Sequence, residues 1–423
     1  MKAILVGVKL DTISSDIFNN EMLELSNLAI ACDIDVVETV TQELPEFNSK
    51  TYVGKGKVQE IKEFSEALEC DVIIFNDELS PVQISNLDNL LEKSIYDRTY
   101  LILEIFKSRA RTREAILQVE LASLSYLLPR LTGLRSGLSR QRGAGGGYAH
   151  GRGAGETQLE LDRRITNDKI AQIKKELRAL TDKRKQQRIK RNKSILKTVA
   201  LVGYTNSGKS SLMNAFLQKS MVSDIKNVME KDMLFATLET STRKVSTTMG
   251  SFLLTDTVGF IDKLPHMLVE AFKSTLEEIK EADLLIHVVD SSNEKFLEQI
   301  TTTNKVLDEI GVKDIPIIYA FNKIDKVDDY LYIPKEYPNA IRISAKEDIN
   351  INVLIKRVIS DLYSDYISYT FKIPYVKQSI LYEIKEYAVN SAITYNDDGV
   401  EMVCLAPEYI KEKYDEFIKK AED

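Results

Sequence analysis

The segment TVALVGYTNSGKSSLMNAF constrains the fold most, because it reads as a buried strand, a glycine-rich turn and a helix in direct succession. Gly203, Gly208, Lys209 and Ser210 have the spacing of a loop that cradles phosphate groups at a helix N-terminus. A chance glycine turn is the plain alternative. We expect Lys209 to neutralise the β- and γ-oxygens and Ser210 to ligate Mg²⁺. The residues expected to contact nucleotide here are Gly203, Tyr204, Thr205, Asn206, Ser207, Gly208, Lys209, Ser210 and Ser211.

A second motif closes the next core strand, SFLLTD, with the residues Asp256, Thr257, Val258 and Gly259. A DxxG motif is common by itself, but its position at a strand end after a phosphate-binding loop gives it meaning. We expect Asp256 to hold Mg²⁺ through water and the Gly259 amide to sense a γ-phosphate.

Two more motifs predict the base. AFNKID places Asn322, Lys323, Ile324 and Asp325 at another strand end, and ISAKED adds the loop residues Ser344, Ala345 and Lys346. Guanine offers an N1–H and an exocyclic amine, and one carboxylate accepts both. Adenine lacks that amine and would leave the Asp325 carboxylate partly unpaired. The four ordered motifs therefore predict a GTP hydrolase.

The segment LFATLETSTRKV lies between the first two motifs and is the candidate switch. Thr237 is expected to reach Mg²⁺ and the γ-phosphate only when GTP is bound, with Thr240, Ser241 and Thr242 as competitors. A polar connecting loop is the alternative. With Lys209 and Gly259, Thr237 completes the candidate catalytic set. The switch residues expected to contact nucleotide are Phe235, Ala236, Thr237, Leu238 and Glu239.

Two features of these motifs bear on the rate of hydrolysis. Phe260 follows DTVG where Ras-like enzymes place the glutamine that orients water, so we expect slow intrinsic hydrolysis and stimulation by a partner. The side-chain carbonyl of Asn206 is a candidate ligand for K⁺ beside the phosphates.

Positive charge is concentrated in residues 107–197, where 23 Lys and Arg face 8 Asp and Glu, although the whole chain carries a net charge of −7. A solvated, salt-bridged helical face is the ordinary reading of a charge run, but the excess of one sign favours a surface for a polyanion. Nine of the chain's 18 glycines lie between Gly133 and Gly155. This stretch predicts a mobile basic loop, 129–156. Its candidate RNA contacts are Arg135, Arg140, Arg142, His150 and Arg152.

Long helices are expected on both sides of this loop. One covers 101–128, which lacks glycine and proline, and the other runs from near Glu156 to about Lys197. Ile170, Ile173, Leu177 and Leu180 repeat at heptad-like spacing in the second helix. At about 1.5 Å per residue, such a hairpin is long enough to hold the loop on the order of 60 Å from its base.

The chain as a whole is predicted to be an α/β multidomain protein. We expect an N-terminal α/β domain (1–100), a helical hairpin (101–197), a doubly wound G domain (198–365) and a C-terminal α+β domain (366–423). Apolar residues make up 43% and charged residues 29%, which excludes global disorder. The absence of long apolar runs and of a signal peptide predicts a cytoplasmic protein without membrane contact. Cys32, Cys70 and Cys404 form no CxxC pair and are expected to be reduced.

The sequence resembles the HflX family of translational GTPases, in the G domain and outside it. TYVGKGKVQEI (51–61), FNDELSPVQ (75–83) and GAGETQLELDRRI (153–165) look like its N-terminal and helical signatures, and GYTNSGKSSLMNA, LFATLETSTR and DTVGFI match its G domain. The resemblance implies a protein that binds the large ribosomal subunit, with its loop directed to ribosomal RNA near the peptidyl transferase centre. A monomer is the simplest expectation for its oligomeric state. GTP-bound members split stalled or idle ribosomes under stress.

The sequence also departs from the family pattern. RGAGGGYAHGRGAGE is longer than the usual loop and lacks its proline, and FATLETST stands where DPT is commoner. The altered loop suggests a variant that rescues antibiotic-bound ribosomes. The alternatives are a large-subunit assembly GTPase and an RNA-remodelling NTPase that also uses ATP.

Overall fold

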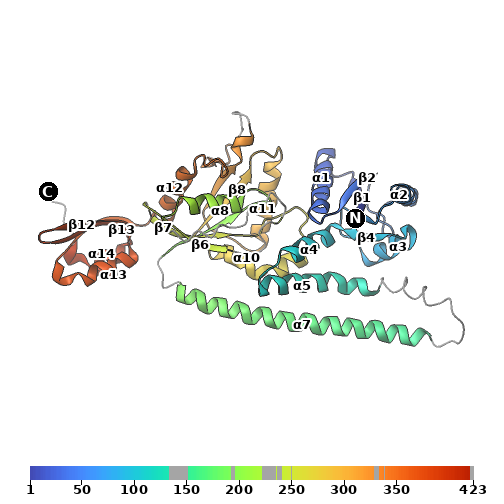
Figure 1. Cartoon of the computed structure of the whole chain (residues 1–423), viewed down its shortest axis with the longest axis horizontal. Helices are drawn as coiled ribbons and strands as arrows, with labels where there is room; N and C mark the ends of the chain where they lie inside the picture. The colour runs from blue at the N-terminus through green and yellow to red at the C-terminus, as the bar shows by residue number, and fades with distance from the viewer. Residues whose placement is uncertain are drawn as a thin grey trace. The chain divides into compact units, whose positions relative to one another are not determined.

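The computed structural model describes residues 1–132, 151–191, 196–221, 235, 241–248, 250–327, 333–337 and 339–419. Contacts divide the chain into two units. The first comprises Met1–Thr181, Met233–Phe235 and Lys263–Phe272, and the second comprises the rest. Three sheets with helices packed around them confirm the predicted multidomain α/β architecture (Figure 1).

The first unit begins with a four-stranded parallel sheet of order β2-β1-β3-β4. Its strands are β1 (Lys2–Leu10), β2 (Asp35–Leu44), β3 (Val72–Phe75) and β4 (Ser94–Asp97), and its helices are α1 (Ser15–Ala31), α2 (Lys55–Ala67), α3 (Pro81–Leu91) and α4 (Arg98–Arg109). Ile4, Val6 and Val8 alternate along β1 and pack with Val58 and Ile61 of α2 in one core. The central strands β1 and β3 are apolar and almost wholly buried, as expected of parallel strands covered on both faces.

The predicted single helix over 101–128 is wrong, because the chain forms two helices there. After α4, the side chain of Thr112 accepts a hydrogen bond from the Ala115 amide and starts α5 (Arg113–Leu127), which a short 3₁₀ turn, Leu128–Thr132, follows. Threonine at the N-cap with Glu114 in the first turn is a start signal that an absence of glycine and proline does not cancel.

The second long helix, α7 (Gly151–Arg191), begins inside the glycine-rich stretch. It therefore starts five residues before the expected Glu156 and includes Gly151, Gly153 and Gly155. Each glycine costs about 1 kcal/mol relative to alanine, a cost that extension of a formed helix can absorb. The rest of the predicted loop, 133–150, lies outside the described residues.

Helices α5 and α7 lie side by side (Figure 1). Leu117 and Leu121 of α5 pack with Ile173 of α7, and Leu124, Ile170, Leu177 and Leu180 complete this cluster. The predicted heptad-like spacing thus corresponds to an apolar seam between two helices. Ion pairs flank it, with Arg113–Glu176 at 2.8 Å and Lys169–Glu120 at 2.5 Å.

The second unit contains a six-stranded sheet of order β10-β9-β8-β5-β7-β6, in which β6 alone pairs antiparallel. The strands are β5 (Thr198–Val202), β6 (Ser241–Thr247), β7 (Gly250–Asp256), β8 (Leu284–Asp290), β9 (Ile317–Asn322) and β10 (Ile341–Arg342). The helices of this unit's larger part are α8 (Lys209–Gln218), α10 (Lys273–Lys280), α11 (Phe296–Glu309) and α12 (Ile351–Leu362). Helices α8 and α12 share one core with the sheet, and α11 packs on another.

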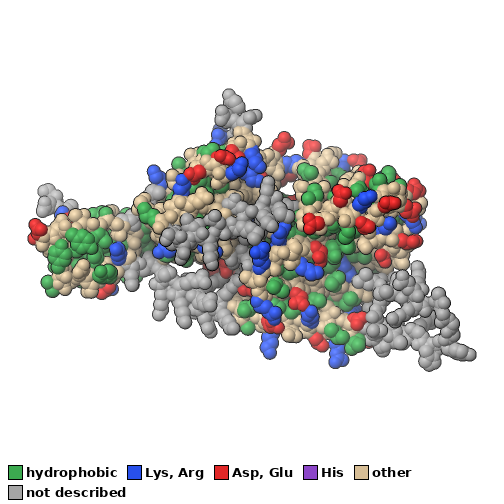
Figure 2. Space-filling view, in the orientation of Figure 1, with side chains coloured by type: hydrophobic (Ala, Val, Ile, Leu, Met, Phe, Trp, Pro, Cys, Tyr) green, Lys and Arg blue, Asp and Glu red, His purple; other side chains and the backbone are tan. Residues whose placement is uncertain are grey.

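A small antiparallel sheet of order β11-β13-β12 ends the chain. It consists of β11 (Ile367–Ile373), β12 (Val389–Asn396) and β13 (Gly399–Ala406), with α13 (Ser379–Tyr387) and α14 (Glu408–Lys413) packed on it. Figure 2 shows hydrophobic side chains gathered on the surface of this C-terminal module. Tyr375, Tyr382, Tyr395 and Tyr409 are among those exposed.

Two further expectations can be compared with the described residues. None of the helices described is both long and apolar enough to cross a membrane. Cys32, Cys70 and Cys404 are free thiols, of which Cys70 and Cys404 are buried.

Candidate nucleotide site

Two glycines shape the predicted phosphate-binding loop, residues 203–211, where β5 passes into α8. Gly203 has φ +147°, and a Cβ atom there would lie 2.3 Å from the carbonyl oxygen of Val288. Gly208 has φ +95°, and its Cβ would lie 2.2 Å from Nδ2 of Asn322. Any other residue would collide with its neighbours at these positions. The loop can therefore approach a ligand with its backbone.

Lys209 lies inside this loop. Its ammonium group donates to the carbonyl oxygens of Tyr204 at 2.7 Å and Gly203 at 3.1 Å. Burial lowers the pKa of Lys209 to about 8, although the Asp256 carboxylate opposes this shift. A buried cation bonded to neutral carbonyls gains free energy when an anion arrives. The buried hydroxyl of Ser207 also has no partner within the described part of the chain. The loop thus fits a phosphate group.

Oxygen ligands converge beside Lys209. The Ser210 hydroxyl donates to Oδ2 of Asp256 at 2.7 Å, and Asp256 is fully buried at the end of β7. Thr257 turns away and donates to the carbonyl of Leu201 at 2.6 Å. A hydroxyl and a carboxylate are the hard donors that Mg²⁺ prefers, so this pair fits the predicted metal. Thr237, its neighbours and the competitor Thr240 lie outside the described residues, whereas the competitors Ser241 and Thr242 belong to β6.

The residues after DTV pair with the phosphate-binding loop. The Thr205 amide donates to the Phe260 carbonyl at 2.7 Å, and the Phe260 amide donates to the Gly203 carbonyl at 3.2 Å. A Cβ atom on Gly259 would lie 2.7 Å from Cα of Thr205 and 3.1 Å from Nζ of Lys209. The structure therefore brings Gly259 next to Lys209, as expected for two groups that contact the same phosphate.

The predicted base-recognition residues gather at the ends of β9 and β10. Asn322 donates from Nδ2 to the Ser207 carbonyl at 2.9 Å and accepts from the Ala345 amide at 3.0 Å. It thereby joins the phosphate-binding loop to the ISAKED loop. Ser344 donates to Oδ1 of Asp325 at 2.5 Å. Because Asp325 is exposed, its second oxygen remains accessible to a base.

Lys323 contacts Asp290, a site residue that the sequence motifs did not predict. Its ammonium donates to the Asn206 carbonyl at 2.8 Å and to Oδ2 of Asp290 at 2.7 Å. Asp290 ends β8, just as Asp256 ends β7. Carboxyl ends of parallel strands meet at one edge of a sheet, and this position was the signal that could have identified Asp290. Ile324 and Lys346 lie beside these residues in sequence, and Lys346 forms a surface ion pair with Glu347.

Comparisons with known families agree with this geometry. Residues 19–107 match the model of a GTP-binding GTPase N-terminal domain, 109–191 that of a GTP-binding GTPase middle region, and 198–323 that of a 50S ribosome-binding GTPase. The GTPase HflX of Caldanaerobacter subterraneus is 41% identical over 418 residues, which cover 99% of this chain and 94% of the relative. The chain belongs to the HflX family of GTPases. It is therefore a GTP hydrolase, as the four motifs predict.

Other relatives span similar lengths. GTPase HflX of Escherichia coli K12 is 39% identical over 84% of this chain and 82% of its own length. A crystal structure of a GTP-binding protein from Sulfolobus solfataricus in complex with GDP is 27% identical, covers 86% of this chain and 99% of its own, and has a TM-score of 0.44.

Phe260 and His287 lie inside the core near the site of this HflX family member. Phe260 is 1% exposed, so its side chain does not reach a water molecule beside the phosphates. His287 of β8 is buried, as expected for a core histidine. Burial and the nearby Lys209 lower the pKa of His287 to about 3, which keeps it neutral. Its Nδ1 has no hydrogen-bond partner among the described residues.

The base of the predicted basic loop is held by a buried polar cluster in the first unit. Arg130 lies 3.3 Å from Asp97 and stacks over the Tyr126 ring at 3.5 Å. Tyr126 in turn donates to Asp97 at 2.9 Å. Burial raises the pKa of Asp97 despite Arg130. Of the predicted RNA contacts, Arg152 belongs to α7, and Arg135, Arg140, Arg142 and His150 lie outside the described residues.

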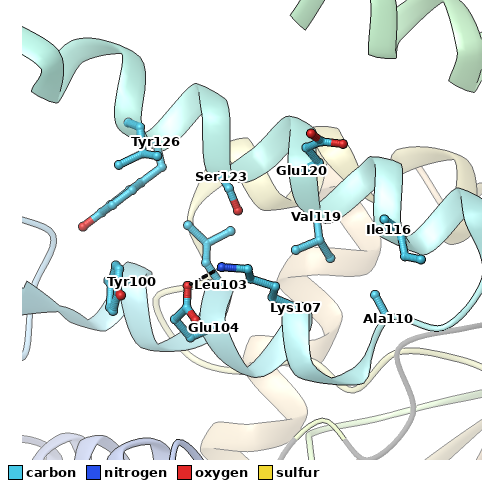
Figure 3. Close-up of a pocket in the computed structure, with 11 residues that line it drawn as sticks. Tyr100, Leu103, Glu104, Lys107, Ala110, Ile116, Val119, Glu120, Ser123 and Tyr126 are labelled. Carbon is cyan, nitrogen blue, oxygen red and sulfur yellow. Dashed lines mark hydrogen bonds and ion pairs between the residues drawn. The ribbon is translucent and has the colours of Figure 1, made fainter. Parts of the chain in front are cut away.

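A hollow of about 410 Å³ borders this cluster between α4 and α5 (Figure 3). Its walls are mostly apolar and include Leu103 and Val119. Glu104 and Lys107, which lie 3.4 Å apart, add an ion pair at the wall formed by α4. Tyr126 belongs both to this wall and to the Arg130 cluster. Of the predicted nucleotide-binding and RNA-binding residues that the structure describes, none lines the hollow.

Proposed function

We propose that this GTPase binds the large ribosomal subunit in its GTP form and dissociates stalled or idle ribosomes. The observation that carries the proposal is the stem formed by α5 and α7. Its apolar seam joins the helices that precede and follow residues 133–150, which we call the basic segment. The matched model of a 50S ribosome-binding GTPase supports the same partner. Ribosomal RNA is a polyanion with which a cationic probe on a stiff stem can interact.

The stem gives the basic segment a defined origin. The Arg130 cluster lies directly before residue 133, and α7 begins at Gly151. Both ends of the segment are thus attached to structured elements of the first unit. We infer that Arg135, Arg140, Arg142, His150 and Arg152 contact RNA near the peptidyl transferase centre.

The G domain makes ribosome dissociation depend on bound GTP. We assign phosphate binding to the 203–211 loop with Lys209, Mg²⁺ binding to Ser210, Asp256 and Thr237, and γ-phosphate sensing to Gly259. Bound Mg²⁺ would neutralise charge on the phosphate oxygens. Asn322, Lys323, Asp325, Ser344, Ala345 and Lys346 select guanine. Because Phe260 is buried and apolar, the ribosome is assigned the task of organising the attacking water.

We place this activity in the cytoplasm, on whole ribosomes, with the protein acting as a monomer. Stress is the condition under which idle ribosomes accumulate, and rescue of antibiotic-bound ribosomes is the extension that the long basic segment suggests. The C-terminal module, with its exposed tyrosines, is assigned a contact near the ribosomal GTPase centre.

Potassium is the proposed second cation. Asn206 is exposed at φ +58° in the phosphate-binding loop, and its backbone carbonyl is already bonded to Lys323. Its side-chain carbonyl is the group assigned to K⁺. We expect hydrolysis to be several-fold faster in potassium than in sodium buffer, and Asn206→Ala to remove the difference. Equal rates for the natural protein in the two buffers would dispose of this role.

A change of base specificity tests the nucleotide gate. Xanthine carries a carbonyl where guanine carries the exocyclic amine, so an amide in place of the Asp325 carboxylate suits xanthine instead. In Asp325→Asn, the amide oxygen still accepts from Ser344, and we expect GTP affinity to fall by about a hundredfold while xanthosine triphosphate restores ribosome dissociation. The matched control is Asp361→Asn, a surface carboxylate bonded to Arg357 on α12.

The outcomes also separate the alternatives. Dissociation of mature ribosomes by Asp325→Asn with xanthosine triphosphate alone supports the proposal. Binding only to immature large subunits on sedimentation would instead favour an assembly GTPase. Strand unwinding without ribosomes, or with ATP, would favour an RNA-remodelling NTPase.

A further inference from the structure

A cluster of acidic and polar side chains lies at the carboxyl edge of the N-terminal sheet. In open parallel sheets, ligands bind outside the carboxyl ends of the strands, at the point where the strand order reverses. In the order β2-β1-β3-β4, this point lies between β1 and β3. Asn76 and Asp77 directly follow β3, and Glu21 projects from α1. The cluster therefore lies where open parallel sheets bind ligands, although none of the nucleotide motifs contributes to it.

Hydrogen bonds hold the polar groups of this cluster in place. Asn76 donates to Oε2 of Glu21 at 3.0 Å and accepts from Arg98 at 3.2 Å. The Tyr52 hydroxyl donates to Oδ2 of Asp77. The side chains of Glu21 and Asp77 are 8% and 16% exposed. Two largely buried carboxylates require a cation between them.

Lys263 supplies that cation. Its ammonium group lies 2.6 Å from Oε2 of Glu21 and 2.8 Å from Oδ1 of Asp77. Burial alone would lower the pKa of Lys263, but the carboxylates of Asp77 and Glu21 outweigh it and raise the pKa. The residue has φ +53°, a left-handed conformation that a lysine adopts only when its surroundings compensate.

Lys263 lies four residues after Gly259, and the intervening backbone is fixed. Phe260 pairs with Gly203 and Thr205, and the Asp262 amide donates to the Tyr204 hydroxyl at 2.9 Å. Four residues span at most about 14 Å even when fully extended. The position of Lys263 therefore limits the positions that the Gly259 amide can take.

Phe235, two residues before Thr237, is attached in a similar way. It is 1% exposed at φ +53° and packs edge-on against Phe106 of α4, with ring centroids 4.6 Å apart. Phe272 packs against the same ring at 5.0 Å. Phe235 and Lys263–Phe272 accordingly belong to the first unit, although each lies close in sequence to a residue assigned to the γ-phosphate.

We propose that Glu21 and Asp77 form an ammonium-binding site whose ligand is Lys263, and that Lys263 is a positioning residue for Gly259. The anchored lysine restricts the conformations of 259–263 before nucleotide binds. It therefore lowers the entropic cost of placing the Gly259 amide on a γ-phosphate. A nucleoside diphosphate has no γ-phosphate for this amide to contact, so the anchored lysine does not change its affinity. This inference rests on the proposed role of Gly259.

The test compares diphosphate with triphosphate in the absence of ribosomes. In Lys263→Gln, we expect affinity for a non-hydrolysable GTP analogue and single-turnover hydrolysis to fall by about tenfold, with GDP affinity unchanged. Lys263→Arg, which keeps the charge, should restore much of the loss. Asp77→Asn should show the same losses as Lys263→Gln. The double variant Lys263→Gln/Asp77→Asn should lose no more affinity for the GTP analogue, and no more hydrolysis, than either single variant.

The matched control is Lys219→Gln. Lys219 also has a side chain that is 30% exposed and forms an ion pair with Asp348, but it lies outside the 259–263 segment. It should behave like the natural protein. Equal losses of GDP and GTP binding, faster hydrolysis or unchanged values in Lys263→Gln would overturn the proposal.

Gly259→Ala distinguishes the role of Gly259 from the role of the ammonium site. The added Cβ atom would lie 2.7 Å from Cα of Thr205, so it would displace the Gly259 amide without changing Lys263. If Gly259→Ala binds the GTP analogue as well as the natural protein does, the role of Gly259 fails. If only Gly259→Ala loses selectivity for triphosphate, the ammonium site fails while the role of Gly259 stands.

Discussion

Lys209 shows how one buried charge sets the conditions for nucleotide binding. Its ammonium is bonded to the carbonyl oxygens of Gly203 and Tyr204, and burial is the largest influence on its pKa. Loss of the proton removes the charge that attracts phosphate. Nucleotide binding, in turn, stabilises the protonated form. Proton binding and nucleotide binding at this residue are therefore linked.

This linkage predicts a pH dependence of affinity. The free protein has a pKa of about 8 at Lys209, below the ordinary value of 10.5, so the ammonium is present below pH 8 and lost above it. We expect the dissociation constant for GTP to rise by up to about tenfold per pH unit above pH 8. Fluorescence titration from pH 7 to 9.5 measures this.

Lys209→Arg is the control, because a guanidinium stays protonated over that range. Its affinity should be lower but flat with pH. A flat profile for the natural protein would show that Lys209 keeps its proton when no nucleotide is bound.

At the scale of elements, the seam between α5 and α7 determines whether the stem is rigid. Ile173 is 3% exposed within this seam, whereas Ile165, eight residues earlier on the same helix, is 56% exposed. We expect Ile173→Ala to destabilise the α5–α7 pairing by about 2–4 kcal/mol and Ile165→Ala by less than about 0.5 kcal/mol. Amide hydrogen exchange in the two helices measures the difference.

Ribosome dissociation should weaken together with the seam. If Ile173→Ala frees both helices to exchange but dissociates ribosomes at the natural rate, a rigid stem is not required. Hydrogen exchange is suited to this test because a chain of several domains does not unfold in one transition.

The sequence predicted those elements whose signals are local. The strand before Gly203, the helix after it and the strand ends at Asp256 and Asn322 all follow from short patterns of apolar residues. The boundary at Thr112 was missed because its capping signal was weighed less than the lack of glycine and proline. The start of α7 at Gly151 was missed because propensity is a weak guide at the end of a long helix.

Contacts between distant residues could not be predicted. Lys263 and Glu21 are 242 positions apart, and Arg130 and Asp97 are 33 apart. A lysine after DTVGFID reads as an ordinary surface residue, and only the folded sheet brings two carboxylates to it. The same holds for the Asp290–Lys323 pair, whose members come from neighbouring strands.

In the molecule as a whole, the nucleotide site belongs to the second unit and the α5–α7 stem belongs to the first. The first unit also includes Phe235 and Lys263–Phe272, which lie in sequence next to the two γ-phosphate motifs. A change at the γ-phosphate can thus be passed along the chain itself. GTP and GDP should accordingly differ in their effect on ribosome binding.

The most direct measurement is light scattering of purified ribosomes titrated with the protein and a non-hydrolysable GTP analogue. We expect scattering to fall as the subunits separate and GDP to produce no fall. We also expect no fall, with either nucleotide, for a variant in which a short Gly-Ser linker replaces residues 143–150. Equal dissociation with GDP, or full dissociation by the shortened variant, would contradict the proposed function.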